Sequence, residues 1–157
     1  MTRRTLAAAL GLALFATSAA HAAAPAQPKE KPKVVHAGFV PDFRLKASLY
    51  HQGAGGVGGK DSLGCTPAPM RTVAIDPKKI PRRTVLFIAE TVGLPLPGGA
   101  KHDGYWYASD VGGAVKGDRI DLYTGKGKDS MKPLMKLNLK KLSVARKGTF
   151  KGCPPKA

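Results

Sequence analysis

Six short runs of alternating or β-branched residues, separated by glycine and proline turns, constrain the fold of this 157-residue chain most strongly. The runs cover residues 43–50, 71–75, 84–89, 105–110, 119–123 and 142–146. Turn signals lie at 53–59, 76–77, 95–99, 112–113 and 117–118. One short helix is expected over 129–136, where Pro133 limits it to a first turn or a break. Short strands with many turns predict a mainly β fold, either a barrel or a sandwich.

The N-terminus predicts export. Arg3 and Arg4 precede an apolar run over 6–19, and Ala20-His21-Ala22 matches the signal-peptidase pattern, so residues 1–22 are expected to be a signal peptide. The apolar run is too short and too rich in alanine for a stable membrane span. Residues 23–41 are expected to form a flexible linker, and residues 42–157 a single domain. The mature protein is therefore expected in the periplasm or outside the cell.

Cys65 and Cys153 are the two cysteines of the chain. An oxidising compartment favours a disulfide between them, which would tie the C-terminal tail to the middle of the domain. Two unpaired buried thiols are the alternative. Neither cysteine has a CxxC partner or a neighbouring histidine, so no metal site is expected, and no cofactor is predicted.

The charge balance favours anionic partners. The chain holds 26 lysines and arginines against 10 aspartates and glutamates, a formal net charge of +16. An exported chain rarely meets nucleic acid, and no nucleic-acid-binding motif is present, so nucleic acid is not expected as a partner. The expected partners are the anionic cell-envelope surface and the glycan strands of peptidoglycan. The alternative is that the lysines only keep the protein soluble. The sequence does not define an oligomeric state.

Three aspartates have settings typical of a catalytic site. Asp76 ends a strand run before a proline, Asp110 ends an aromatic run before a double glycine, and Asp121 lies within an alternating run. Alternation predicts that Asp110 shares a face with Trp106. Carboxylates that recur at strand ends suit acid–base chemistry. Each aspartate also has a structural alternative: a turn residue for Asp76 and Asp110, and an ion pair with Arg119 or a lysine for Asp121.

Four motifs contain these aspartates and their neighbours. They read Val73-Ala74-Ile75-Asp76-Pro77, Ile80-Pro81-Arg82-Arg83, Ala108-Ser109-Asp110-Val111-Gly112-Gly113-Ala114-Val115-Lys116-Gly117 and Arg119-Ile120-Asp121-Leu122-Tyr123. In sequence and order they resemble the 3D domain family, which is named for its three aspartates. The resemblance covers about residues 45–123. Val111 stands where the family usually has threonine, and Arg82-Arg83 stand where it has leucine and glycine.

The resemblance implies both a fold and a reaction. The family includes the catalytic barrel of membrane-bound lytic transglycosylase A, so a six-stranded double-psi β-barrel with loop insertions is expected. The implied reaction cleaves the MurNAc–GlcNAc bond of peptidoglycan and forms a 1,6-anhydro sugar without consuming water. The implied acid/base is the aspartate of the Asp-x-Gly-Gly motif, Asp110. Asp121 and Asp76 would tune its protonation, bind sugar hydroxyls or orient it.

The same motifs suggest substrate contacts. Gly112 and Gly113 would let the backbone approach the glycan, and Lys116 and Lys78 would contact substrate carboxylates. The aromatic residues expected to stack on sugar rings are Trp106, Tyr105 and Tyr107. Burial in the core is the alternative for Trp106. A second function fits these residues as well: a non-catalytic, expansin-like module that binds peptidoglycan or another glycan.

Overall fold

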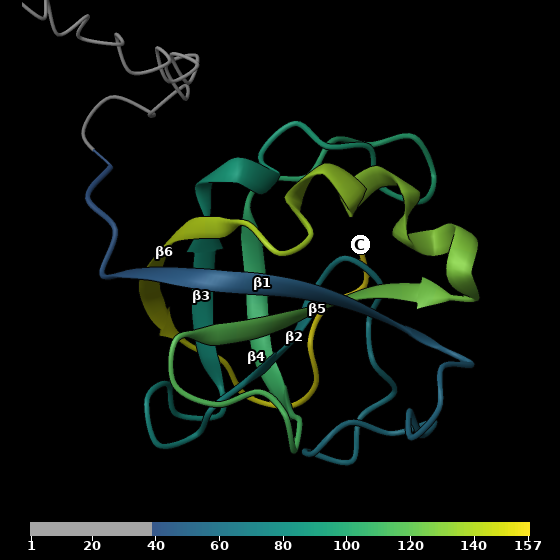
Figure 1. Ribbon diagram of the computed structural model, residues 1–157, viewed down its shortest axis with the longest axis horizontal. Helices are drawn as coiled ribbons and strands as arrows, with labels where there is room; N and C mark the ends of the chain where they lie inside the picture. Colours follow the sequence, from purple (N-terminus) through teal and green to yellow (C-terminus); the bar gives the residue numbers. More distant parts are fainter. Residues whose placement is uncertain (1–38) are drawn as a thin grey trace, which may run out of the picture. The chain divides into compact units, whose positions relative to one another are not determined.

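Each predicted strand run forms a strand in the computed structural model, which describes residues 39–157 (Figure 1). The strands are β1 (Phe43–Gln52), β2 (Thr72–Ile75), β3 (Thr84–Ile88), β4 (Tyr105–Val111), β5 (Arg119–Lys126) and β6 (Lys141–Thr149). The predicted signal peptide and residues 23–38 of the predicted linker lie outside the described residues. The sequence therefore located all six strands, although β1, β5 and β6 extend further than their apolar patterns indicated.

The six strands close into a barrel with the order β1-β5-β2-β4-β3-β6. β1 pairs with β5 and β2 pairs with β4 in parallel, whereas the other four pairs are antiparallel. The two strands of each parallel pair are not consecutive in sequence, so the chain that joins them crosses the barrel and does not form a hairpin. The expected fold class, a mainly β chain with a six-stranded double-psi barrel, is confirmed.

The barrel interior is filled by two side chains from each strand. These inward residues are 0% exposed and alternate with outward ones, as a period of two requires. They are Leu45 and Ala47, Val73 and Ile75, Leu86 and Ile88, Trp106 and Ala108, Ile120 and Leu122, and Leu142 and Val144. Because these positions face inward, the residues between them on β1, β2 and β5 face outward, and the candidate site is built on that outer face.

Two short helices accompany the barrel. The first, η1, covers Ala89–Thr91, and the second, η2, covers Lys128–Leu137 and buries Leu134 and Leu137. Pro133 does not end or break η2, so that part of the prediction was wrong. The element is wound as 3₁₀ turns, and although Pro133 supplies no N–H to them, the turns continue on both sides of it. Within residues 39–157, no helix is long and apolar enough to cross a membrane.

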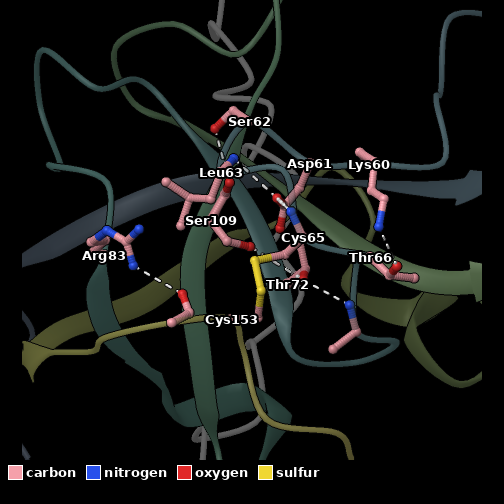
Figure 2. The surroundings of a disulfide bond; sticks show 12 residues. Lys60, Asp61, Ser62, Leu63, Cys65, Thr66, Thr72, Arg83, Ser109 and Cys153 are labelled. Carbon is pink, nitrogen blue, oxygen red and sulfur yellow. Dashed lines mark hydrogen bonds between the residues drawn. A yellow bond between two sulfur atoms is a disulfide. The ribbon is translucent and has the colours of Figure 1, made fainter.

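The expected disulfide joins Cys65 to Cys153, with a Cα–Cα distance of 5.7 Å (Figure 2). It anchors the C-terminal segment to a turn that begins at Asp61. The Asp61 carboxylate accepts hydrogen bonds from the backbone amides of Leu63 and Cys65, at 3.0 and 2.8 Å. The turn is thus held by both a covalent bond and a buried side chain.

Arg83 occupies a backbone position that favours glycine. Its φ is 69°, in the left-handed region, and the resembled family has glycine there. The Arg83 backbone amide donates to the Ala108 carbonyl, and its side chain donates to the Gly152 carbonyl at 2.9 Å. These contacts stabilise a conformation that is otherwise unfavourable, and they attach the segment before β3 to the residue preceding Cys153.

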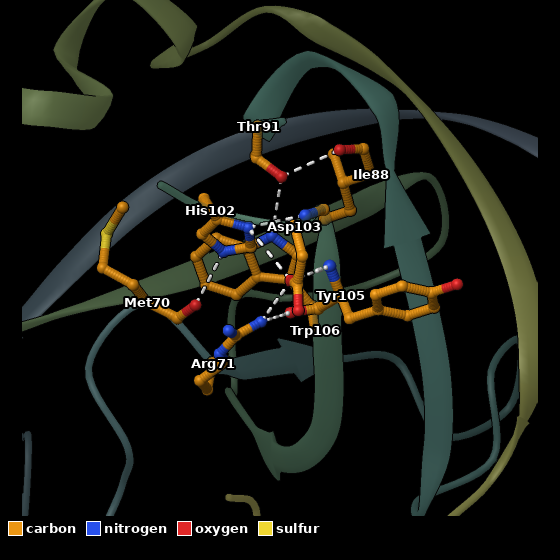
Figure 3. A network of polar contacts seen from close by, with 9 residues as sticks. Met70, Arg71, Ile88, Thr91, His102, Asp103, Tyr105 and Trp106 are labelled. Carbon is orange, nitrogen blue, oxygen red and sulfur yellow. Dashed lines mark hydrogen bonds and ion pairs between the residues drawn. The ribbon is translucent and has the colours of Figure 1, made fainter. Parts of the chain in front are cut away.

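A buried polar network lies beside the beginning of β4 (Figure 3). The His102 ring stacks on Trp106, its Nε2 donates to the Met70 carbonyl, and its Nδ1 accepts from the Gly104 amide. The Trp106 indole in turn donates to Thr91 Oγ1 at 3.1 Å. Both ring nitrogens of His102 are therefore satisfied in the neutral form, and burial, aided by the charge of Arg71, lowers its pKa below the usual 6.5.

Acid is expected to destabilise the domain through His102. Since the folded-state pKa lies below 6.5, the stability associated with neutral His102 is complete above that pH and is lost as the pH falls. His102→Gln keeps one donor and one acceptor but does not titrate, so its unfolding free energy should depend less on pH between about 7 and 5. Urea unfolding at both pH values measures this, with His51→Gln as the matched control. An unchanged pH slope in His102→Gln would contradict the assignment.

Candidate active site

A cavity of about 500 Å³ lies on the outer face of the barrel, over β1, β5, β2 and β4. These strands contribute Tyr50, Asp121, Ala74 and Asp110 respectively. The glycine-rich segment 54–58, the residues around Asp61, and Pro67, Val111, Gly112 and Val115 also line it. The cavity has the size of an ordinary ligand pocket, and three of its lining residues are aspartates.

Strand register explains why Asp110 and Asp121 meet at this cavity. Asp121 is paired with Ser48 on one side and with Ala74 on the other, and Ala74 is paired with Asp110. Paired residues point to the same face, so the two carboxyl groups flank Ala74 at backbone positions about 10 Å apart. Ala74 contributes only a methyl group between them. The small residue leaves a depression between two acidic side chains.

A β-bulge in β4 decides on which face Asp110 lies. Val73 is paired with Ala108 but the next residue, Ala74, is paired with Asp110, so Ser109 is an extra residue in β4. The prediction that Asp110 shares the face of Trp106 was therefore wrong. Trp106 is 0% exposed and points into the core, whereas Asp110 lines the cavity.

Asp110 is held by three hydrogen-bond donors. Tyr50 Oη donates to its Oδ2 at 2.8 Å, and the backbone amides of Ser62 and Val111 donate to its Oδ1 at 3.1 and 2.9 Å. Both carboxylate oxygens are thus engaged by groups from β1, from the Asp61 turn and from β4 itself.

Asp121, unlike Asp110, has a carboxyl oxygen without a hydrogen-bond donor among the described residues. Its Oδ1 is buried and has no hydrogen-bond partner in the described part of the chain. Burial raises the pKa of Asp121 from 3.8 to about 6, and the nearby Asp110 charge adds to the rise, while Ser48 and Arg119 oppose it. Asp121 therefore holds its proton at a pH at which an ordinary aspartate has lost it. Such a carboxyl can act as a proton donor in weakly acidic solution.

Two cavity residues were missed by the sequence analysis, Asp61 and Tyr50. Asp61 is 6% exposed, and its Oδ2 has no hydrogen-bond partner among the described residues. Burial, followed by the charges of Asp110, Asp121 and Asp61, raises the pKa of Tyr50. The signal for Asp61 was weak: an acidic residue between a glycine-rich stretch and a cysteine. Tyr50 belongs to a recognised strand run, but nothing in that run singles out its hydroxyl.

Asp76 does not line the cavity. Its Oδ2 accepts a hydrogen bond from the Gly117 amide at 2.8 Å, and its Oδ1 accepts one from the Lys78 amide at 3.0 Å. These two bonds, led by the one from Gly117, lower the pKa of Asp76. The side chain joins the turn after β2 to the turn before β5, which matches the turn role considered from the sequence.

The other predicted substrate contacts are mostly outside the cavity. Gly112 lines it, and a Cβ at Gly112 would lie 2.8 Å from Val115, so the missing side chain gives Val115 its place in the wall. Residues that do not line it are Gly113, Lys78, Lys116, Trp106, Tyr105 and Tyr107. Tyr105 packs against Phe87 and Tyr107 against Phe150, both on the outside of the barrel. Tyr50 is the aromatic residue of the cavity lining.

The cavity is therefore a cleft that holds three carboxyl groups: Asp121 with a raised pKa, Asp110 with a hydrogen bond on each oxygen, and Asp61 with one oxygen unpaired among the described residues. Among residues 39–157, no group of three or more acidic, histidine or cysteine side chains is arranged to hold a metal ion. The chemistry that the arrangement supports is proton transfer by Asp121 next to a fixed negative charge.

The protein is a β-barrel with a carboxylate-lined site on its outer face. Comparison with protein families shows which family this barrel resembles. Residues 71–134 match the model of the 3D domain, which confirms the resemblance seen in the motifs. A comparison with curated proteins finds no match.

Several solved structures are similar to part of the chain. They include E. coli MltA with bound chitohexaose, at 27% identity and a TM-score of 0.42, and the lytic transglycosylase LtgG of Burkholderia pseudomallei, at 29% identity and a TM-score of 0.40. Each comparison covers 58% of this chain, and covers 28% of MltA and 26% of LtgG. The chain thus spans about a quarter of the length of these enzymes.

Proposed function

We propose that this domain is a lytic transglycosylase that cleaves the MurNAc–GlcNAc bond of peptidoglycan and leaves a 1,6-anhydro-MurNAc end. The observation that carries the proposal is the Asp121 carboxyl, which lines the cleft with an unpaired Oδ1 and a pKa raised to about 6. The 3D domain match over residues 71–134 supports the substrate class.

The proposed reaction needs only one proton-transferring group. Protonated Asp121 donates its proton to the glycosidic oxygen as the bond from that oxygen to the MurNAc anomeric carbon breaks. The C6 hydroxyl oxygen of the same sugar then bonds to the anomeric carbon, and its proton passes to the Asp121 carboxylate. The proton is returned, no water is consumed, and the product is an anhydro sugar. An ordinary glycosidase would require a second carboxyl as nucleophile or base.

This mechanism assigns the acid/base role to Asp121 instead of Asp110, which the Asp-x-Gly-Gly motif implied. Asp110 accepts hydrogen bonds from three donors that hold its carboxyl group in place, whereas Asp121 Oδ1 is buried without a partner among the described residues. Its charge, in contrast, helps to raise the pKa of Asp121. We therefore assign Asp110 as the charged neighbour that adds to the effect of burial on the pKa of Asp121 and that stabilises positive charge developing on the sugar.

The second candidate is a non-catalytic glycan-binding module. Val111 favours it, because this residue lines the cleft without the hydroxyl that threonine would supply there. An exported location suits both candidates, and the Cys65–Cys153 disulfide fits an oxidising compartment.

Digestion of purified sacculi with the mature protein, followed by mass spectrometry of the released fragments, tests the proposal. Lytic cleavage should release anhydro-muropeptides, whereas hydrolysis would give reducing ends heavier by one water. Binding to sacculi without release of any fragment would exclude the enzyme and favour the binding module. A heat-denatured sample of the same preparation controls for fragments already present in the sacculi.

A further inference from the structure

Tyr50 lines the acidic cleft together with Asp61, Asp110 and Asp121. It comes from β1, outside the residues 71–134 that match the 3D domain. Its hydroxyl donates to Asp110 Oδ2 at 2.8 Å, and its ring packs on Tyr123 of β5 with 5.1 Å between centroids. The ring is thus fixed by β5 while the hydroxyl is fixed on β4. Tyr50 connects the two strands that carry the carboxylates.

The other oxygen of Asp110 is held from the opposite side. The Ser62 amide donates to Asp110 Oδ1 at 3.1 Å. The Ser62 hydroxyl donates to the Ser109 carbonyl at 2.9 Å (Figure 2). Ser62 belongs to the turn that Asp61 and the disulfide stabilise. Arg82 Nε further donates to the Ser62 hydroxyl at 3.1 Å. Asp110 therefore lies between two supports, a phenol from β1 and an anchored turn.

The charges around Tyr50 prevent it from exchanging its own proton. Three carboxyl groups face it: Asp110 from β4, Asp121 from β5 and Asp61 from the loop. Together with burial, they raise the phenol's pKa, and Lys60 is the one cation among the residues described as lining the cavity. The phenol stays protonated, and its single O–H is committed to Asp110. Tyr50 can thus hold a carboxylate but cannot act as a base.

We propose that Tyr50 is a positioning residue for glycan cleavage, whose hydroxyl holds the Asp110 carboxylate at the distance from Asp121 that the reaction requires. The role rests on the proposed function, but the contacts that define it do not. Without the hydroxyl, Asp110 keeps the donors on Oδ1 and loses the one on Oδ2, so its side chain is free to turn away from Asp121.

Tyr50→Phe tests this role, because it keeps the ring on Tyr123 and removes only the hydroxyl. The kcat for anhydro-muropeptide release should fall about 10- to 100-fold, as expected for a lost hydrogen bond to a charged group, with KM unchanged. The alkaline limb of the pH–rate profile should move to lower pH, because Asp110 then contributes less to the raised pKa of Asp121. Tyr123→Phe is the matched control and should leave kcat and the profile unchanged.

A second readout separates this role from the proposed function. The titration of Asp121, followed by NMR of its side-chain carboxyl in the intact protein, should shift to lower pH in Tyr50→Phe and not in Tyr123→Phe. A shift in a protein that does not cleave sacculi would show that Tyr50 holds Asp110 near Asp121, and would reject the proposed cleavage. An unshifted titration, or a kcat loss without movement of the alkaline limb, would reject the positioning role.

Discussion

Replacing Asp121 with asparagine is expected to lower glycan cleavage by about 10³-fold or more, because the proposed proton donor and acceptor are both lost. Initial rates of anhydro-muropeptide release at pH 5 measure the effect. Asp118→Asn is the matched control: the same chemical change in the turn before β5, at an exposed side chain that pairs with Lys79. It should retain nearly full activity.

The same Asp121→Asn substitution is expected to stabilise the folded domain above pH 6. The folded-state pKa of about 6 lies above the ordinary 3.8, so wild-type stability declines as the pH rises through this window. At pH 7 the buried charge costs at most about 3 kcal/mol, since each pKa unit corresponds to about 1.4 kcal/mol. Asparagine carries no charge and avoids this cost. Urea unfolding at pH 7 should therefore show an inactive variant that is more stable than the wild type.

Asp110→Asn distinguishes the two assignments of the acid/base. If Asp110 is the charged neighbour, its loss lowers the rate and moves the alkaline limb of the pH–rate profile to lower pH, but it leaves measurable cleavage. Full activity in Asp121→Asn together with complete loss in Asp110→Asn would restore the assignment implied by the Asp-x-Gly-Gly motif.

Cleavage by the wild type is expected to fall as the pH rises through about 6. The reaction requires protonated Asp121, and its pKa is raised to about 6 by burial and then by Asp110. A pH–rate profile of sacculus digestion measures the midpoint. A rate that stays constant from about pH 5 to 8 would show that another group supplies the proton.

The second large effect is expected from removal of the disulfide, which should lower the free energy of unfolding. Cys65 and Cys153 are separated by 88 residues, and closing a loop of this length stabilises a fold by roughly 4–5 kcal/mol in the chain-entropy model. That is a large part of the 5–15 kcal/mol typical of a domain. The double variant Cys65→Ala/Cys153→Ala should therefore unfold at a much lower urea concentration. It should also lose cleavage activity, because the turn that supports Asp110 through Ser62 is no longer anchored.

Reductant supplies the control for the disulfide. Dithiothreitol should lower the urea midpoint of the wild type towards that of the double variant, and should not change the variant itself. Equal midpoints for the oxidised wild type and the double variant would contradict a stabilising role for the bond.

The sequence carried most of the information on the fold. Period-two alternation located the six strands, since inward residues such as Ile120 and Leu122 must be apolar in a barrel core. The motifs identified Asp110 and Asp121, and the cysteine count predicted the disulfide. The end of β6 was not predicted, because its last residues are exposed and are held by pairing with β3 and not by burial. The end of β5 was not predicted either, because its buried residues Thr124 and Gly125 are polar or small and give no apolar signal.

Sequence alone determined which strands form and which aspartates are candidates for the site; only the tertiary structure decided which of them share one face of the barrel and what each can do. Protonation depends on burial and on hydrogen-bond partners, and these come from distant parts of the chain. Tyr50 reaches Asp110 across 60 residues, and Ser62 reaches it across 48. Asp76 finds the Gly117 amide instead and lies outside the cleft. The bulge at Ser109 sets the face of Asp110, because the register between β2 and β4 is a property of the paired strands and not of either one alone.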